Sequence, residues 1–417
     1  MIFFRQTLVP IALAAFFLAV VSVQAGTQDV MMQGFHWESH QGGSYSEPWW
    51  EVIEGNAPDL ENAGFTHVWF PPVSNAGSDE GYLPRELDNL NSQYGTDTQL
   101  WDAVWAVRNN NMQPIADVVV NHRVGCTDWA DFCSPFWETW YIVANDEWPG
   151  GPKSGNYDTG DGFHAGRDLD HASSTVRNAI TYWMNNTLKG TGFTGWRFDY
   201  VKGFSAGYVG EYAANTSPVF CVGELWDDLN YNNVNAHRQQ LMNWINGTGN
   251  RCKAFDFTTK GLLNKALWDN EYWRLRDSNG SPAGAIGWWP AMSVTFVDNH
   301  DTGPSRSCSE GQNHWPVPCG DVMEGYAYIL THPGIPMVYW AHYYDWNLKN
   351  AINTLINIRK NQGIHSESTV SIAQAQNGLY AAYIGSNVAM KIGPNSWSPG
   401  GGWTLATSGN NYAVWTK

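Results

Sequence analysis

The sequence predicts an α/β protein, a (β/α)8 TIM barrel with an inserted irregular domain and a C-terminal antiparallel β domain. Three observations support this fold class. Eight short runs of apolar, β-branched or aromatic residues alternate with stretches of helical periodicity. About fifty residues without periodicity separate the third run from the fourth, and the C-terminal segment alternates apolar with polar residues.

The predicted strands are short and apolar, and they are spaced so that a helix fits between most pairs. They span residues 30–35, 66–70, 115–120, 194–198, 219–222, 253–257, 292–297 and 335–340. The helical candidates are 48–63, 98–109, 173–188, 258–275, 321–331 and 348–362. We therefore predict a barrel from residues 26–120 and 171–365, an insertion at 121–170, and a β-sheet domain at 366–417.

The N-terminus has the pattern of a secretory signal peptide over residues 1–25. Arg5 supplies the positive charge, residues 9–21 are almost wholly apolar, and small residues at 23 and 25 form a cleavage site. A membrane anchor is the alternative, but the apolar run is shorter than the roughly 20 residues that a span requires. The sequence therefore predicts a secreted, extracellular protein.

The composition narrows the ligand class. The chain has 39 acidic side chains against 23 Lys and Arg, a formal charge of −16, which argues against nucleic acid or an anionic membrane as partner. Charged residues make up only 15%, whereas there are 24 tryptophans and 14% aromatic residues. Flat aromatic faces with few charges suit a neutral amphipathic ligand such as a carbohydrate, although a Trp-rich core would have the same composition.

Six cysteines remain in the predicted exported chain, and an even number favours disulfides. Two local pairs suggest themselves, Cys126 with Cys133 and Cys308 with Cys319, which leaves Cys221 with Cys252. The cysteine and histidine spacings match no zinc motif.

Charged and polar side chains gather where the predicted strands end, which is the active-site face of such a barrel. They are Asp117, Asn121 and His122; Arg197, Asp199 and Lys202; Glu224 and Trp226; and Asp298, His300 and Asp301. Neighbouring carboxyl groups separate each other's pKa values, so that one stays protonated while another stays ionised. Glycoside hydrolysis requires such a pair.

These four strand ends resemble the four signature segments of the α-amylase family, glycoside hydrolase family 13. The resemblance extends from about residue 30 to the end of the chain. Segments 33–39, 254–261, 273–276, 286–290 and 326–334 are similar to plant-type α-amylases in particular. Segments 220–226 and 251–253 are similar to bacterial maltotetraose-forming amylases.

The resemblance implies a role for each residue. Asp199 would be the nucleophile, Glu224 the acid and base, and Asp301 the group that stabilises the transition state. Arg197 would orient Asp199, and Asp117 would be structural. The remaining residues would contact the sugar chain: His122, His300, Tyr82, Lys202 and Trp226. Buried ion pairing is the alternative for the acids, and ordinary packing for Tyr82 and Trp226.

The insertion contains a locally acidic loop, and oxygen ligands on a flexible segment suit Ca²⁺. In the family this insertion is domain B, which calcium clamps to the barrel. The matching ligands are the side chains of Asn121, Asp158, Asp161 and Asp168 and the carbonyl of Gly203. We expect one ion, the alternative being a solvated acidic turn.

Trp288 and Trp289 are adjacent in a loop before the seventh strand. Plant-type enzymes use such a pair to hold starch granules, whereas two packed rings would be the structural alternative. The resemblance as a whole implies a monomeric, retaining α-amylase that cuts α-1,4 bonds inside starch, amylose and maltooligosaccharides, with Ca²⁺ and no organic cofactor. An exo-acting maltooligosaccharide-forming amylase and a non-catalytic glucan-binding protein are the alternatives.

Overall fold

The computed structural model describes residues 26–417 except 43–44, 149 and 152, so the predicted signal peptide lies outside the described residues. Eight parallel strands close into a barrel, which confirms the predicted fold class. In barrel order, closing from β2 back onto β1, the strands are β1 (Met31–Gln33), β12 (Ile335–Tyr339), β11 (Ser293–Phe296), β10 (Lys253–Phe255), β9 (Phe220–Gly223), β8 (Gly195–Phe198), β5 (Gln113–Val118) and β2 (His67–Trp69).

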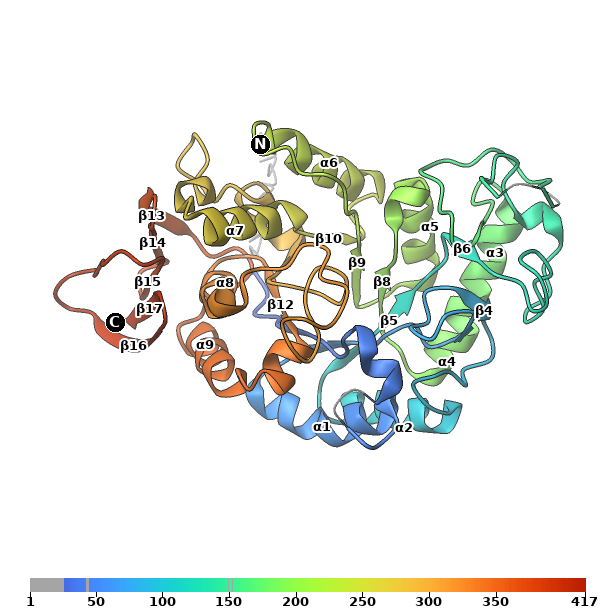
Figure 1. Cartoon of the computed structure of the whole chain (residues 1–417), viewed down its shortest axis with the longest axis horizontal. Coiled ribbons are helices and arrows are strands. Elements are labelled where there is room, and N and C mark those ends of the chain that lie inside the picture. The colour runs from blue at the N-terminus through green and yellow to red at the C-terminus, as the bar shows by residue number, and fades with distance from the viewer. Residues whose placement is uncertain (1–25, 43–44, 149, 152) are drawn as a thin grey trace, which may run out of the picture.

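Helices surround the barrel (Figure 1). They are α1 (Trp49–Ala63), α2 (Asp97–Asn109), α3 (Ser174–Trp183), α4 (Lys189–Thr191), α5 (Ala206–Thr216), α6 (Val234–Gly247), α7 (Phe257–Asp269), α8 (Val322–Thr331) and α9 (Lys349–Asn361). Helical turns of 3-10 type span Trp37–Gln41, Thr139–Tyr141, Val201–Gly203, Tyr272–Leu275, Ala285–Gly287, Pro290–Met292 and Cys319–Asp321, and π-helical turns span Met184–Leu188 and Ala341–Asp345. Helices α5 and α6 were not among the predicted candidates.

One predicted helix ends earlier than its sequence pattern. Helix α7 begins at its cap Asp256, whose side chain accepts a hydrogen bond from the Thr259 amide, and it ends at Asp269 rather than at residue 275. Asn270 has a φ of 61°, a left-handed conformation that terminates a helix. Beyond this point the chain forms a 3-10 turn, Tyr272–Leu275, which also buries apolar side chains at Tyr272 and Leu275.

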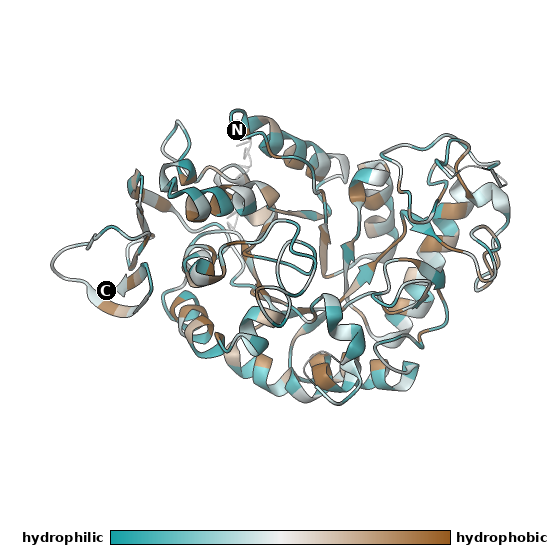
Figure 2. Cartoon of the chain, viewed as in Figure 1, coloured by the Kyte–Doolittle hydropathy of each residue, from teal (hydrophilic) through white to brown (hydrophobic). Residues whose placement is uncertain are grey.

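The barrel strands are buried on both faces, as is typical of parallel sheets covered by helices. Figure 2 shows hydrophilic and hydrophobic residues interleaved along the surrounding helices, as expected for helices with one face against the core. Within the described part of the chain, none of the helices combines the length and the apolarity that crossing a bilayer requires.

The insertion leaves the barrel after β5 and returns at α3, on the side of the molecule opposite the C-terminal sheet (Figure 1). Its strands are β6 (His122–Arg123) and β7 (Arg167–Asp168), which pair antiparallel, and β3 (Asn75–Ala76) pairs with β4 (Pro84–Glu86) in the preceding loop. The buried Arg123 side chain donates hydrogen bonds to the carbonyls of Arg85, Ser134 and Pro135. Arg123 therefore ties the insertion to the preceding barrel loop.

The C-terminal sheet has the strand order β13 (Val370–Gln376), β14 (Leu379–Ile384), β15 (Val388–Ile392), β17 (Tyr412–Thr416) and β16 (Thr404–Gly409). All its pairs are antiparallel, as predicted. Buried Glu324 of α8 joins this sheet to the barrel, because its carboxylate accepts hydrogen bonds from the Tyr272 hydroxyl at 2.7 Å and the Gly393 amide at 2.8 Å. The exact domain boundaries remain predictions.

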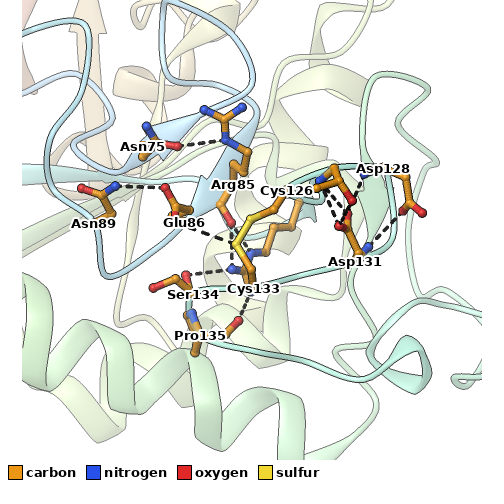
Figure 3. The surroundings of a disulfide bond; sticks show 12 residues. Asn75, Arg85, Glu86, Asn89, Cys126, Asp128, Asp131, Cys133, Ser134 and Pro135 are labelled. Carbon is orange, nitrogen blue, oxygen red and sulfur yellow. Dashed lines mark hydrogen bonds between the residues drawn. A yellow bond between two sulfur atoms is a disulfide. The ribbon is translucent and has the colours of Figure 1, made fainter.

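All three predicted disulfides are present. The Cys221–Cys252 bond joins strand β9 to the residue that precedes the adjacent strand β10, and both cysteines are buried. Cys126–Cys133 closes a short loop of the insertion (Figure 3), and Cys308–Cys319 closes part of the loop after β11.

We expect a Cys221→Ala, Cys252→Ala double variant to lose about 3–4 kcal/mol of unfolding free energy, because the bond closes a loop that is long in sequence. Urea unfolding measures the loss. The Cys126→Ala, Cys133→Ala variant is the control, since it opens a loop with a sequence separation of 7 instead of 31 and should lose less. Equal stability of the Cys221–Cys252 variant and the parent chain would contradict the expectation.

Candidate active site

A single guanidinium organises the carboxylates at the mouth of the barrel. Arg197 of β8 is fully buried, and its Nη1 lies 2.8 Å from Asp117 Oδ1 and 2.6 Å from Asp199 Oδ1. Its Nη2 lies 2.7 Å from Glu224 Oε2. Because side chains alternate along a strand, Arg197 and Asp199 point to the same side of β8. The predicted acids of strands β5, β8 and β9 therefore converge on one cation.

Asp117 has a full set of partners. Its second oxygen, Oδ2, accepts hydrogen bonds from the Tyr82 hydroxyl at 2.8 Å and from Trp69 Nε1 at 3.1 Å. The Arg197 guanidinium also lies 4.7 Å from the centre of the Trp69 ring. Asp117 thus anchors Arg197 and Tyr82, whereas Asp199 and Glu224 are left to face the mouth.

A stack of parallel rings lines the mouth next to this cluster. The His300 ring lies 5.0 Å from the Tyr82 ring at an interplanar angle of 11°, and Trp37 lies parallel to both at 6.2 Å. Gln33 Nε2 donates to His300 Nδ1 at 2.9 Å, which places the imidazole proton on Nε2. That nitrogen lies 3.3 Å from Asp301 Oδ2. His300 therefore connects Tyr82 with the third predicted acid.

His122, which the resemblance places on the sugar, also has partners within the protein. Its Nε2 donates to the Tyr82 carbonyl oxygen at 2.8 Å, and its Nδ1 lies 3.4 Å from Asn121 Nδ2. The Phe163 ring of the insertion stacks on it at 3.8 Å. Both ring nitrogens thus have protein partners, and in this structure His122 holds the Tyr82 segment in place.

Lys202 and Trp226 lie beside Glu224, in a cavity of about 280 Å³ that Tyr200, Asp227 and Asp228 also line. The Trp226 ring stacks on Phe257 at 5.5 Å, which fixes its orientation. The structure thus places both residues, which the resemblance assigns to contact with the sugar chain, on the Glu224 side of the cluster.

Burial and like charge perturb the carboxyl groups. Burial raises the pKa of Glu224 well above its usual value, and neighbouring Asp199 and Asp301 raise it further while Arg197 opposes them. Burial also raises the pKa of Asp301 to about 7, again with Arg197 opposing. A carboxyl group that holds its proton near neutral pH can act as a general acid.

The predicted calcium ligands meet where the insertion touches the barrel. Asn121 Nδ2 lies 3.1 Å from Asp168 Oδ1, and a Cβ added to Gly203 would lie only 2.0 Å from Asn121 Oδ1. The Asp161 amide donates a hydrogen bond to the Lys202 carbonyl at 3.0 Å, and this bond holds the acidic loop next to Gly203. Oxygen donors from three segments are therefore adjacent.

Several carboxylates lie close together in this loop and raise one another's pKa values. Burial raises the pKa of Asp168 to about 9, and the nearby carboxylates of Glu147, Asp158 and Asp146 raise it too. Glu147 Oε1 is buried and accepts no hydrogen bond from the described residues. Asn121, Asp168 and Gly203 thus supply neighbouring oxygen atoms of the kind that a hard cation prefers, and Glu147 is a further carboxylate near them that the sequence patterns did not predict.

A second group of metal-binding side chains does not form a site. Glu86, Cys126 and Cys133 are the described residues whose ligand atoms lie within 4.8 Å of one another. Both sulfurs are in a disulfide, so neither is a thiolate that could bind a metal (Figure 3). The acidic side chains of the predicted calcium site are spaced more widely than this group.

The tryptophan pair lies in the loop before β11, and neither ring fills the barrel. Trp288 is 40% exposed, whereas Trp289 is partly buried against the core. The Arg238 guanidinium lies 4.0 Å above the Trp288 ring, so one face of this indole is covered and its orientation is held.

A Trp288→Ala, Trp289→Ala double variant is expected to adsorb more weakly to insoluble starch granules, because an exposed indole face can remove the apolar face of a sugar from water. Cleavage of short maltooligosaccharides should be almost unchanged. Trp101→Ala is the control, since Trp101 is 49% exposed but lies on α2. Unchanged granule adsorption in a folded double variant would show that the pair is structural.

Paired carboxyl groups around one arginine, at the mouth of a (β/α)8 barrel, define the class of protein: a barrel hydrolase built for glycosidic bonds. Comparison with known proteins identifies the family. The model "Alpha amylase, catalytic domain" matches residues 58–223, and the model "Alpha-amylase C-terminal beta-sheet domain" matches residues 361–416. The chain belongs to the α-amylase family.

Full-length relatives agree with this assignment. The chain is 44% identical to "Probable alpha-amylase 2" of Arabidopsis thaliana, covering 94% of each sequence. It is 31% identical to a glucan 1,4-alpha-maltotetraohydrolase of Roseateles saccharophilus, over 89% of this chain and 68% of the relative. A cyclomaltodextrin glucanotransferase with a three-domain ABC distribution has the same fold, with a TM-score of 0.69 at 16% identity, over 94% of this chain and 99% of that one.

Four further residues contact the site although no sequence pattern predicts a role for them: Gln33, Trp37, Trp69 and Phe163. Gln33 and Trp37 fall in segment 33–39, whose resemblance to plant-type enzymes was the available signal. No sequence pattern pointed to Trp69 or Phe163, because their contacts form only when β2 and the insertion meet at the barrel mouth.

Proposed function

We propose that the protein is a secreted, calcium-binding α-amylase that hydrolyses internal α-1,4-glucosidic bonds of starch and maltooligosaccharides with retention of configuration. One observation carries the proposal: a single buried guanidinium holds Asp199 and Glu224 side by side, and burial raises the pKa of Glu224 well above its usual value. Retaining glycosidases use two carboxyl groups about 5–5.5 Å apart, one as nucleophile and one as acid.

In the first step Asp199 attacks the anomeric carbon while Glu224 donates its proton to the glycosidic oxygen, whose bond to that carbon breaks. The released chain leaves with the new hydroxyl group, and the sugar remains esterified to Asp199. In the second step Glu224 takes a proton from water, the water oxygen attacks the anomeric carbon, and Asp199 leaves. Two inversions give net retention.

The surrounding residues bind and orient the sugar. Tyr82, held by Asp117 and His122, presents its ring to the sugar at the cleaved bond. His300 and Asp301 bind its hydroxyl groups, with His300 fixed by Gln33. Lys202 and Trp226 contact the leaving chain next to Glu224.

NMR of the first product formed from maltoheptaose tests the mechanism. We expect the α-anomer at early times, before mutarotation. Initial formation of the β-anomer would exclude Asp199 as a nucleophile that forms a covalent intermediate.

An exo-acting, maltotetraose-forming enzyme is a second candidate, because two glucan 1,4-alpha-maltotetraohydrolases are each 31% identical to this chain. The same catalytic groups serve both modes of action. The product time course on amylose discriminates between them: endo-action yields mixed lengths and a rapid fall in viscosity, whereas exo-action yields one product length from the start.

The proposed calcium ion would be held by the side chains of Asn121, Asp158, Asp161 and Asp168 and by the Gly203 carbonyl, with Glu147 beside them. The ion would neutralise the negative charge of these carboxylates and would thereby join the insertion to the barrel. Asn121 precedes His122, and His122 pairs with Asp168 between β6 and β7. Loss of the clamp would therefore disturb His122 and, through it, Tyr82.

Removal of calcium by a chelator is expected to lower the melting temperature and the activity together, and added Ca²⁺ should restore both. A ligand that binds only the folded state stabilises it by about 4 kcal/mol at a thousand-fold excess over Kd. Differential scanning calorimetry with elemental analysis makes the measurement, and Asp168→Ala should behave like the chelated protein. Unchanged stability of a sample shown to be metal-free would contradict the calcium site.

Secretion rests on the signal-peptide pattern of residues 1–25, and the three disulfides are compatible with an oxidising compartment. N-terminal sequencing of the protein from culture medium tests it, with Gly26 as the expected first residue. A single-subunit mass by light scattering would support the proposed monomer.

A further inference from the structure

The loop that carries His300 and Asp301 begins on a buried ion pair. Asp298 follows the end of β11 and is fully buried. Its Oδ1 accepts a hydrogen bond at 2.6 Å from Nζ of Lys260, a residue of α7 that is also fully buried. Neither residue belongs to the catalytic cluster around Arg197.

Asp298 also connects the two ends of this loop. Its Oδ2 accepts a hydrogen bond from the Val317 amide at 3.4 Å, on the returning limb, and its Oδ1 accepts one from the Thr302 hydroxyl at 3.4 Å. His342 Nε2 lies 3.7 Å from Oδ2. Lys260 Nζ is closer to Asp298, at 2.6 Å, and is therefore its main ion-pair partner.

Between these attachments lies a tight turn that contains Asp301. Asn299 Oδ1 accepts hydrogen bonds from the amides of Asp301 at 3.1 Å and Thr302 at 2.8 Å, and the Asn299 amide donates to Thr302 Oγ1 at 3.0 Å. The Asp301 carbonyl accepts a further bond from the His314 amide at 3.1 Å. The position of the Asp301 backbone therefore depends on Thr302 and on the returning limb, both of which Asp298 holds.

Helix α7 holds the returning limb at two more points. Asn264 Nδ2 donates to the Trp315 carbonyl at 2.8 Å, and Trp268 Nε1 donates to the Pro316 carbonyl at 2.9 Å. Lys260, Asn264 and Trp268 are spaced four residues apart and so lie on one face of the helix. Lys260 Nζ also donates to Asn264 Oδ1 at 2.8 Å, which joins the first two anchors.

We propose that Lys260 is a positioning residue for Asp301: through its buried ion pair with Asp298 it sets the turn that presents the Asp301 carboxylate to the substrate. The inference rests on the proposed role of Asp301. A buried ion pair contributes little net stability relative to an apolar pair of similar size, so precise placement of the turn is what Lys260 adds. A displacement of about 1 Å in such a group can cost a hundred-fold in rate.

The test is a double-mutant cycle on maltoheptaose hydrolysis with Lys260→Met and Asp301→Asn. We expect Lys260→Met to lower kcat by at least about ten-fold with KM within two-fold, because Asp301 acts mainly in the transition state. In the Asp301→Asn background the same change should lower kcat by less than two-fold. If the fold-losses in kcat of the two single variants multiply in the double variant, Lys260 does not act through Asp301, and the positioning role is wrong while the proposed function stands. If the single variant Asp301→Asn has a normal kcat, the proposed function itself is wrong.

A second variant keeps the proposal testable if Lys260→Met leaves Asp298 uncompensated and does not fold. The neutral pair Lys260→Met, Asp298→Asn removes both charges, and we expect it to regain the melting temperature but not kcat. Wild-type kcat in this variant would show that the pair is only structural. Glu324→Gln is the matched control, since it perturbs a fully buried carboxylate at the C-terminal sheet and should lower the melting temperature while leaving kcat unchanged.

Discussion

An Asp199→Asn variant is expected to lose several orders of magnitude in kcat while keeping its fold. The amide has nearly the shape of the carboxylate and can still accept a hydrogen bond from Arg197, but it cannot form the glycosyl ester. Steady-state hydrolysis of soluble starch measures the loss, and circular dichroism checks the fold. Near-normal turnover of the purified variant would remove Asp199 from the mechanism.

A Glu224→Gln variant is the companion experiment, because it separates the two carboxyl roles. It should lose a similar factor on starch, but far less in the first step on an aryl glycoside whose leaving group needs no proton. With such a substrate a covalent glycosyl-enzyme should accumulate in Glu224→Gln and should not form in Asp199→Asn. Mass spectrometry of the intact protein distinguishes these outcomes, and the reverse pattern would exchange the two assignments.

Among the single substitutions considered, Arg197→Met is expected to cause the largest loss of unfolding free energy. It leaves Asp117, Asp199 and Glu224 close together without their common cation, and removing one partner from a buried ion pair typically costs about 3–5 kcal/mol. Arg197 lowers the pKa values of Glu224 and Asp301, so its loss also raises them further and disturbs the protonation pattern. Urea unfolding and kcat of the folded fraction give the two readouts.

Arg177→Met is the matched control for this experiment. Arg177 forms an ion pair with Glu211 at 2.9 Å, but both side chains are partly exposed to solvent. Pairs of that kind contribute about 0–1 kcal/mol, and this one is outside the catalytic cluster. Equal unfolding free energies for the Arg177 and Arg197 variants would mean that the guanidinium does not hold the carboxylates together.

The barrel could be predicted because its strands are short, mostly apolar and separated by stretches of helical periodicity, and these patterns can be read from the local sequence. The predicted ends of helices were less accurate where the backbone conformation of a single residue determines the end. Helix α7 ends at Asp269 because Asn270 has a left-handed conformation, although the apolar spacing continues to Leu275. The predicted helix 173–188 changes to a π-helix at Met184, and the apolar pattern does not distinguish these two helical forms.

In the candidate site, too, some features could be predicted from the sequence and others could not. Asp199, Glu224 and Arg197 could be named from the sequence because strand ends of a parallel barrel must meet at one face. Their protonation could not, because burial and the distances between charges exist only in the folded chain. The hydrogen bonds that engage both nitrogens of His122 belong to this second kind, since they join segments that meet only at the barrel mouth.

By itself the sequence determined the alternation of strands and helices, the residue types at the strand ends and the cysteines available for pairing. These features depend only on the types of residues and their order along the chain. The tertiary structure alone decided that one buried guanidinium would hold three carboxylates, that Gln33 would fix the His300 tautomer, and that Lys260 would reach Asp298. The physical reason is that ion pairing and desolvation depend on distances between atoms far apart in the chain, and only closure of the barrel sets those distances.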